Sequence, residues 1–217
     1  TGNPYIKEKM DLDIQVSKLK LMKANHTSQK YRLETDIAKN YPVQIAAQKE
    51  QIAGLRADRE AVKPILEEKE KDNFSMMIGG KTYTDRKEAG TAILAACAGL
   101  KAVKSNGQIG EFHGFSLNAS YDSFYQTYKL TIKRQCSYQI EIGKDVLGNL
   151  QRISNALTGI EKRLTEAEQK MENLLSQLAT AQEEVEKPFP KEAELTEKME
   201  RLAELNSLLN MDEKGTS

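Results

Sequence analysis

Residues 146–185 read VLGNLQRISNALTGIEKRLTEAEQKMENLLSQLATAQEEV and decide the fold. Apolar side chains recur here at alternating steps of four and three residues, without a slip. The positions are Val146, Leu150, Ile153, Leu157, Ile160, Leu164, Ala167, Met171, Leu174, Leu178, Ala181 and Val185. A mean spacing of 3.5 residues is typical of a coiled coil. The pattern predicts one helix about 60 Å long whose apolar seam must be covered by another helix.

A partner helix for this seam is available earlier in the chain. Residues 5–39 contain no Gly and no Pro. Pro42 then predicts a kink or a short break, because proline removes a helical hydrogen bond and clashes with the preceding turn. A weaker near-heptad row follows at Tyr41, Ile45, Gln48, Ile52, Leu55, Arg59, Val62 and Leu66. If this row runs antiparallel to residues 146–185, Tyr41 faces Met171.

The C-terminal part of the chain predicts a second break and a final helix. The break is expected at Lys187-Pro188-Phe189-Pro190, and the helix spans about 191–210. This helix would fold back along residues 3–21. Because the two arms match in length, we expect an antiparallel coiled-coil hairpin within one chain. A parallel homodimer through residues 146–185 is the alternative arrangement.

Residues 73–143 predict a small α+β domain between the two arms. Two short strands flank Gly79-Gly80, a typical hairpin turn. Asp85, with Glu88 three residues later, is a capping-box pattern that starts a helix. The apolar face of that helix comprises Ala89, Ile93, Cys97, Leu100 and Val103. Four strands are expected at 108–113, 115–121, 125–134 and 137–142, with one face buried and one wet.

The predicted fold class is therefore α+β, a long antiparallel coiled-coil hairpin with a small antiparallel-sheet-plus-helix domain at its tip. The predicted segments are 1–72 for the first arm, 73–143 for the inserted domain and 144–217 for the second arm. The composition agrees, since 29% of the residues are charged and only 6% are aromatic, as suits long solvated helices.

The distribution of charge and the two cysteines indicate which partners and which location the chain can have. Residues 145–217 hold 15 acids and 9 bases, so the 17 acids and 23 bases that remain lie in 1–144, where attraction to nucleic acid is expected. Cys97 and Cys136 lie in apolar runs, which indicates buried reduced thiols and a cytoplasmic location. The sequence has no run of about 20 apolar residues that would span a membrane.

No catalytic, cofactor-binding or metal-binding residues are predicted. Gly80-Lys81-Thr82 resembles the end of a phosphate-binding loop, but Ser75 stands where that motif needs a glycine. His26 and His113 have no second ligand at metal-binding spacing. We therefore expect that this chain is not itself an enzyme and needs no cofactor.

Two acid-free basic stretches are the candidate nucleic-acid contacts. Residues 14–33 carry Lys18, Lys20, Lys23, Lys30 and Arg32, and residues 123–140 carry Lys129, Lys133 and Arg134 among aromatic side chains. Cations can meet phosphates, and aromatics on a sheet can stack on unpaired bases. The alternatives are that the first stretch is simply a solvated helix face or pairs with the acidic last helix, and that the second is an ordinary half-buried sheet.

Several ordered phrases also resemble a known family. They are TGNPYIKEKMDLD (1–13), LKLMKANH (19–26), KPFPKEAEL (187–195) and LNSLLNMD (205–212). They resemble the region after the helicase domain in very large bacterial proteins of mobile elements. Those proteins combine an adenine DNA methylase-like domain with a Swi/Snf-type helicase domain. The resemblance implies a non-catalytic part of a DNA-processing machine, and no family active-site residue is carried over.

Two hypotheses follow from these observations. The first is an accessory arm of a DNA helicase and methylase polypeptide that contacts or positions DNA, with the rest of that polypeptide as a partner. The second is a structural coiled-coil spacer, or a protein-interaction or dimerisation module, without nucleic-acid contact.

Overall fold

The computed structural model describes residues 2–71 and 73–215, which form two compact units. The first unit contains the described residues up to Ile45 together with those from Asn173 onward. The second unit is Ala46–Glu172. Helices combine with one antiparallel sheet, so the α+β class predicted from the sequence is confirmed.

The N-terminal helical segment consists of α1 (Pro4–Thr35), η1 (Asp36–Asn40) and α2 (Tyr41–Lys71). The side chain of Asn3 caps α1 by accepting the Tyr5 N–H at 3.0 Å. Just before Pro42 the backbone widens into the π-helical turn η1, in which the Tyr41 N–H donates to the Asp36 carbonyl five residues earlier. The backbone at Tyr41 is helical, so the chain continues into α2 through the proline.

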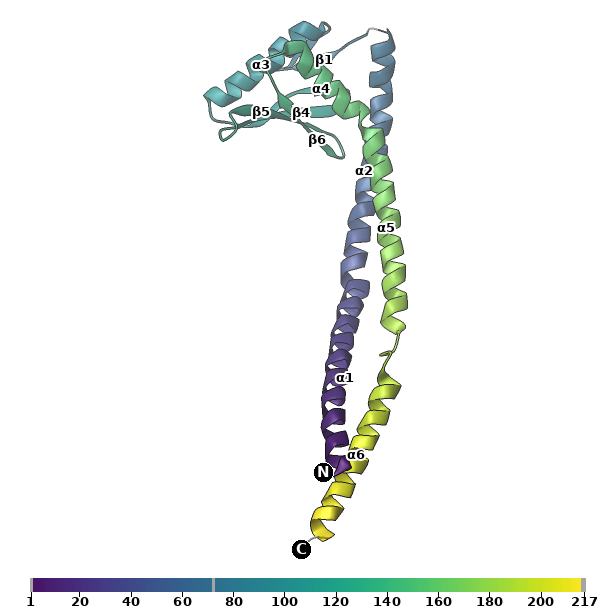
Figure 1. The fold of residues 1–217 in the computed structure, drawn as a ribbon. Helices are drawn as coiled ribbons and strands as arrows, with labels where there is room; N and C mark the ends of the chain where they lie inside the picture. Colours follow the sequence, from purple (N-terminus) through teal and green to yellow (C-terminus); the bar gives the residue numbers. More distant parts are fainter. Residues whose placement is uncertain (1, 72, 216–217) are drawn as a thin grey trace. The chain divides into compact units, whose positions relative to one another are not determined.

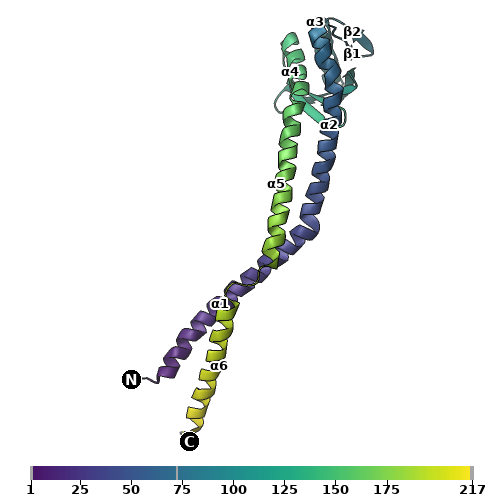
Figure 2. The same cartoon turned by 90° about the vertical axis from the view of Figure 1, so that its right-hand side faces the viewer.

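In the first unit α1 lies antiparallel to α6 (Glu192–Gly215), as Figures 1 and 2 both show. Contacts from later residues of α1 fall on earlier residues of α6. The contacts, in order along α1, are Glu8 with Arg201, Gln15 with Lys198, and Lys23 with Glu192. Val16 and Leu19 pack with Leu195 in the buried centre of this pair. A seam of few apolar residues therefore holds the two helices, with polar contacts along its margins.

The second unit contains a six-stranded antiparallel sheet in the order β2-β1-β3-β4-β5-β6. The strands are β1 (Met76–Ile78), β2 (Lys81–Tyr83), β3 (Gly107–Phe112), β4 (Phe115–Asp122), β5 (Thr127–Lys133) and β6 (Ser137–Ile142). Gly79 and Gly80 form the predicted turn, and both have the positive φ that glycine adopts at least cost. Each predicted strand is present, with boundaries shifted by two residues at most.

Two helices, α3 (Arg86–Ala102) and α4 (Val146–Thr158), cover one face of the sheet (Figure 1). The predicted capping box is confirmed on its first half, because Asp85 Oδ1 accepts the Glu88 N–H at 2.9 Å. Ile93 and Cys97, on the face of α3 that packs against the sheet, are fully buried. Val103 is exposed, so its assignment to the apolar face is wrong, since it follows the last residue of the helix.

The predicted single helix over residues 146–185 is interrupted at Gly159, although the hydrogen bonds of this glycine keep the four-residue spacing of an α-helix. Helix α4 ends at Thr158 and α5 spans Ile160–Glu186. Gly159 donates its N–H to the Asn155 carbonyl at 2.9 Å and accepts the Arg163 N–H at 3.1 Å. The twelve seam positions are nevertheless all buried or half-buried. Different elements cover the two parts of the seam. Helix α4 packs against α3 and β6, whereas α5 lies along other helices.

Helix α2 contacts the first part of α5 within the second unit. The Gln48 Nε2 donates to the Ala167 carbonyl at 2.9 Å, whereas the predicted register places residue 164 opposite residue 48. The predicted α2 row is also wrong in its last part. Asp58 and Ile65 are buried, while Leu66 is exposed. The phase changes where the buried Asp58 side chain accepts hydrogen bonds from the β5–β6 turn and from Tyr138 of β6.

The two cysteines are free thiols in the structure. Cys97 is buried, as predicted, and Cys136 is only half-buried at the β5–β6 turn. Across the described residues, no helix has both the length and the apolar character needed to cross a membrane.

Candidate nucleic-acid interface

The five basic residues predicted on residues 14–33 all lie on α1 and are all exposed. Lys23 forms an ion pair with Glu192 at 2.9 Å. Lys18, Lys20, Lys30 and Arg32 form no ion pair with any described residue. The alternative of pairing with the acidic last helix is therefore realised at one position out of five. Two other acids of α6, Glu194 and Glu204, form ion pairs with Lys198 and Arg201 of α6 itself.

These cations do not form a single stripe. Successive helical residues are rotated by about 100°, so Lys18 and Lys20 point about 200° apart. Arg32 lies within about 40° of Lys18, whereas Lys30 lies nearer the side that faces α6. A straight phosphate backbone could therefore meet two or three of the charges at once, but not all five.

The second basic stretch lies at β5 and the turn that follows it. Lys129 lies 3.5 Å from the Asp122 carboxylate, and Arg134 lies 3.4 Å from the buried Asp58. Lys133 is exposed and has no ion pair among the described residues. Arg134 thus supports the fold, and Lys133 is the member of this set that keeps its charge available. The first and second sets belong to different compact units.

Two of the four aromatic residues of the second stretch belong to the core or pack against it. Tyr138 is buried and its ring contacts Phe115, while Tyr128 packs against Tyr121 with ring centroids 5.2 Å apart. The alternative of an ordinary half-buried sheet therefore holds for these two tyrosines. Phe124 and Tyr125 are largely exposed on the β4–β5 turn.

The β4–β5 turn is held in a defined conformation by Asp122. Its Oδ1 accepts the backbone N–H groups of Phe124 and Tyr125 at 2.9 and 3.1 Å. These hydrogen bonds, with the nearby Lys129, lower the pKa of Asp122 despite some burial. The two aromatic rings contact each other edge to face, with centroids 4.8 Å apart.

The face of the sheet opposite α3 and α4 is polar. Neighbouring strands place Asn118 beside Thr131 and Thr131 beside Gln139. Lys133 lies next to Ser116 on one strand and Ser137 on the other. Hydroxyl and amide groups on such a face can donate to and accept from a polar ligand, but no aromatic side chain of these rows is available for stacking.

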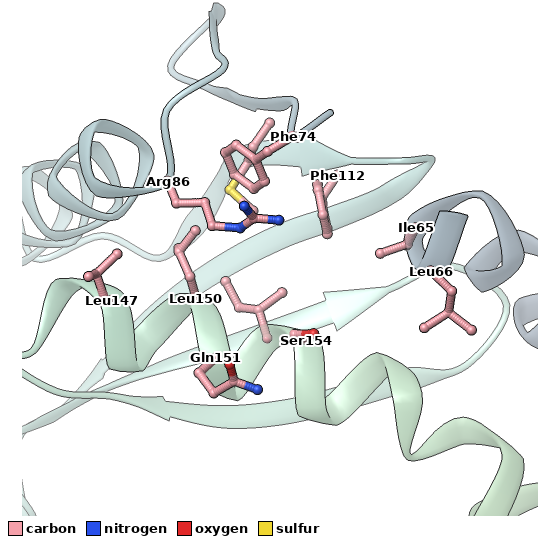
Figure 3. A pocket seen from close by; sticks show the side chains of 11 residues that line it. Ile65, Leu66, Phe74, Arg86, Phe112, Leu147, Leu150, Gln151 and Ser154 are labelled. Carbon is pink, nitrogen blue, oxygen red and sulfur yellow. The ribbon is translucent and has the colours of Figure 1, made fainter. Parts of the chain in front are cut away.

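Sequence reasoning did not find a cavity of about 410 Å³ in the second unit (Figure 3). Apolar side chains from α2, β1, β3 and α4 line it, including Ile65, Phe112 and Leu150. Arg86 lies over the Phe74 ring, 5.1 Å from its centroid, and Gln151 and Ser154 supply further polar groups. Among the described lining residues there is no Asp, Glu, His, Cys or Lys, so they offer no general base.

The two histidines lie in different units, and each contacts a phenylalanine ring. The His26 ring contacts Phe189, and His113 lies beside Phe112 at the β3–β4 turn. No group of three or more His, Cys, Asp or Glu side chains in the described ranges could hold a metal ion.

Comparison of the chain with protein-family models, with curated proteins and with solved structures finds no match in any of the three. The functional conclusion therefore rests on the residues and their arrangement.

Proposed function

We propose that this chain is a non-catalytic, DNA-contacting or DNA-positioning arm of a larger DNA helicase and methylase polypeptide of a bacterial mobile element. The ordered phrases at both ends of the sequence motivate the choice of parent polypeptide. The finer arrangement expected from the sequence, one coiled-coil hairpin that carries the α+β domain, belongs to this proposal, as does a cytoplasmic location.

One observation carries the DNA-contacting part of the proposal. Lys18, Lys20, Lys30 and Arg32 stay exposed and form no ion pair with a described residue, although an acid-rich helix runs beside α1. A helix whose bases served only to bind α6 would be expected to direct most of them toward its carboxylates. Exposed cations that lack a protein partner attract phosphates and release counterions on binding.

The expected mode of binding is sequence-independent. Cations spread over several sides of α1 would contact phosphates of a strand that crosses the helix. Lys133, in the other unit, is a separate candidate contact. Because such contacts carry no base information, we expect positioning rather than sequence recognition.

Fluorescence anisotropy on single-stranded and duplex DNA across a salt series tests this proposal. For duplex DNA, each phosphate contact contributes about 0.9 to the slope of log affinity against log salt. The quadruple variant Lys18→Gln, Lys20→Gln, Lys30→Gln, Arg32→Gln should weaken binding and flatten this slope.

The control variant removes the same charge elsewhere. Lys49, Lys87, Lys144 and Lys170 are exposed and lack an ion pair among the described residues, so their replacement by Gln changes net charge equally. If the two quadruple variants weaken DNA binding equally, the affinity depends only on the net charge of the chain and not on the α1 surface. An absence of DNA binding at low salt would remove the DNA-contacting role.

The second candidate function is a structural spacer or a protein-interaction module without DNA contact. The observation that favours it is that much of the chain forms paired helices, whose seam residues over 146–185 are all buried or half-buried. This candidate is supported if the fragment binds the helicase part of its polypeptide while DNA affinity is absent.

A further inference from the structure

Helix α1 has a second apolar row, on the side turned away from the buried contact with α6. Five large apolar side chains in it are half or more exposed. Their exposed fractions are 50% for Ile6, 62% for Met10 and 64% for each of Ile14, Leu21 and Tyr31. Leu21 points about 200° from the buried Leu19. We call the row from Met10 to Tyr31 the outer seam.

The outer seam has the spacing of a coiled coil. Between Met10 and Tyr31 the steps alternate between four and three residues, and the three positions not yet named are small, Ser17, Ala24 and Ser28. All of these residues are exposed. The row is about 32 Å long. An exposed helical row that carries four large apolar side chains over this length indicates an interaction site.

The heptad phase assigns the charged residues beside the outer seam. Ile14 and Leu21 take a positions and Met10, Ser17, Ala24 and Tyr31 take d positions. The residues at e are then Asp11, Lys18, Asn25 and Arg32, and those at g are Asp13, Lys20, Thr27 and Glu34. In parallel coiled coils the g residue of one helix contacts the following e residue of the other, and these pairs set orientation.

In a parallel pair of α1 helices, the residues at the g positions of one copy are complementary in charge to those at the e positions of the other. A second copy in the same register places Asp13 beside Lys18 of that copy, twice by symmetry. Lys20 then faces Asn25, and Thr27 faces Arg32, so no like charges meet. Asp13 and Lys18 are both exposed, and neither forms an ion pair with a described residue.

An antiparallel copy fits less well. The antiparallel register that sets large against small side chains pairs Met10 with Ser28, Ile14 with Ala24 and Leu21 with Ser17. The same register brings Lys18 close to Lys18 of the other copy, and Lys20 close to Lys20 of the other copy. Like charges beside a seam are destabilising, so the charges select the parallel form.

We propose that the outer seam of α1 binds the outer seam of a second copy of this chain, forming a parallel, in-register homodimer. This surface differs from the 146–185 seam, which is already buried within one chain. The proposal does not depend on DNA binding, and its test contains no DNA.

Sedimentation velocity of the full chain over a concentration series tests the dimer. Leu21→Glu places two carboxylates in the middle of the interface and should raise the dimer dissociation constant at least about tenfold. Met211→Glu, at an exposed apolar residue of α6 in the same unit, should leave the constant unchanged. Because Leu21 is exposed, helix content should be the same in both variants.

A chain that remains monomeric at every concentration overturns the proposal. So does a dimer whose dissociation constant Leu21→Glu does not change.

Single cysteines on the outer seam test the orientation. In a Cys136→Ser background, Ser17→Cys and Ala24→Cys each meet their own counterpart in the parallel register. Both should form covalent dimers under mild oxidation. If neither variant cross-links while the double variant Ser17→Cys, Leu21→Cys does, the helices are antiparallel and the proposed arrangement is overturned.

Discussion

The carboxylate of Asp58 on α2 accepts a hydrogen bond from the hydroxyl of Tyr138 on β6, with 2.7 Å between the oxygens. The same carboxylate accepts the backbone N–H groups of Gln135 at 3.0 Å and Cys136 at 2.8 Å. Asp58 is fully buried, and Arg134 is its cationic neighbour. Burial and the bond to Asp58 raise the pKa of Tyr138. One buried acid therefore fastens α2 to the β5–β6 turn.

Replacing Asp58 should destabilise the second unit strongly. Asp58→Asn keeps the shape of the side chain but turns an amide N–H₂ toward groups that already donate. We expect the free energy of unfolding to fall by about 2–4 kcal/mol. Urea unfolding followed by circular dichroism measures this change. Glu50→Gln, an exposed acid on the same helix, is the control and should stay within about 0.5 kcal/mol of the wild type.

Two glycines of α3 should respond oppositely to alanine. A Cβ at Gly90 would lie 2.7 Å from the Val146 carbonyl oxygen and would also overlap the Val146 side chain, whereas one at Gly99 meets nothing within 4 Å. Gly90→Ala should therefore lower the melting temperature by forcing α3 and α4 apart. Gly99→Ala should raise stability by up to about 1 kcal/mol through helix propensity. A Gly90→Ala protein as stable as Gly99→Ala would contradict the close approach.

The buried thiol of Cys97 should make stability fall at alkaline pH. Burial raises its pKa from the ordinary value of 9.0 to about 11, so the folded state disfavours the thiolate. The stabilisation is fully present below pH 9 and is lost as the pH rises toward 11. Unfolding free energies measured between pH 8 and pH 11 should fall more steeply for the wild type than for Cys97→Ala. Parallel pH curves for the two proteins would rule this out.

The ion pair between Glu8 and Arg201 should make the α1–α6 contact sensitive to acid. Arg201 donates to both oxygens of Glu8, at 2.8 and 3.1 Å, and lowers the pKa of that carboxyl. Its contribution is present above the ordinary pKa of 4.5 and is lost as the pH falls through the lowered value.

Melting temperatures at pH 7 and pH 3 test this contribution. Glu8→Gln should be less stable than the wild type at pH 7, and the difference should be smaller at pH 3. Glu34→Gln, an exposed acid of α1 without an ion pair among the described residues, is the control for which no difference is expected at either pH. A constant difference between Glu8→Gln and the wild type would assign the effect to packing.

The break at Gly159 shows which part of the fold periodicity can predict. The four–three spacing continues across Gly159, and the positions on both sides of it are buried as predicted. Spacing records which side chains are covered, but it does not record the direction of the helix axis. A glycine preceded by Thr158 was the available signal, since glycine weakens a helix at that point.

The α2 row and the basic stretches illustrate the limits of reading a site from sequence. The burial of Asp58 depends on donors about 80 positions later in the chain, so no local pattern could assign it to the interior. The same limit applies to Arg134, which the sequence suggests as a DNA contact because its acid partner, Asp58, is distant in the sequence. Helical spacing predicts that the α1 bases are exposed. It does not tell which of the two apolar rows of α1 is covered, because that depends on the position of α6.

The ends of the sheet bear on how the protein behaves at high concentration. An uncovered strand edge is a template for aggregation. At one edge β2 has only three residues and begins with Lys81. At the other edge Arg163 donates to the Ser137 carbonyl at 3.1 Å, and Asn149 bonds both backbone groups of Gly143. One edge that could recruit foreign strands into fibrils is therefore kept short at β2, and the other is engaged at both ends of β6.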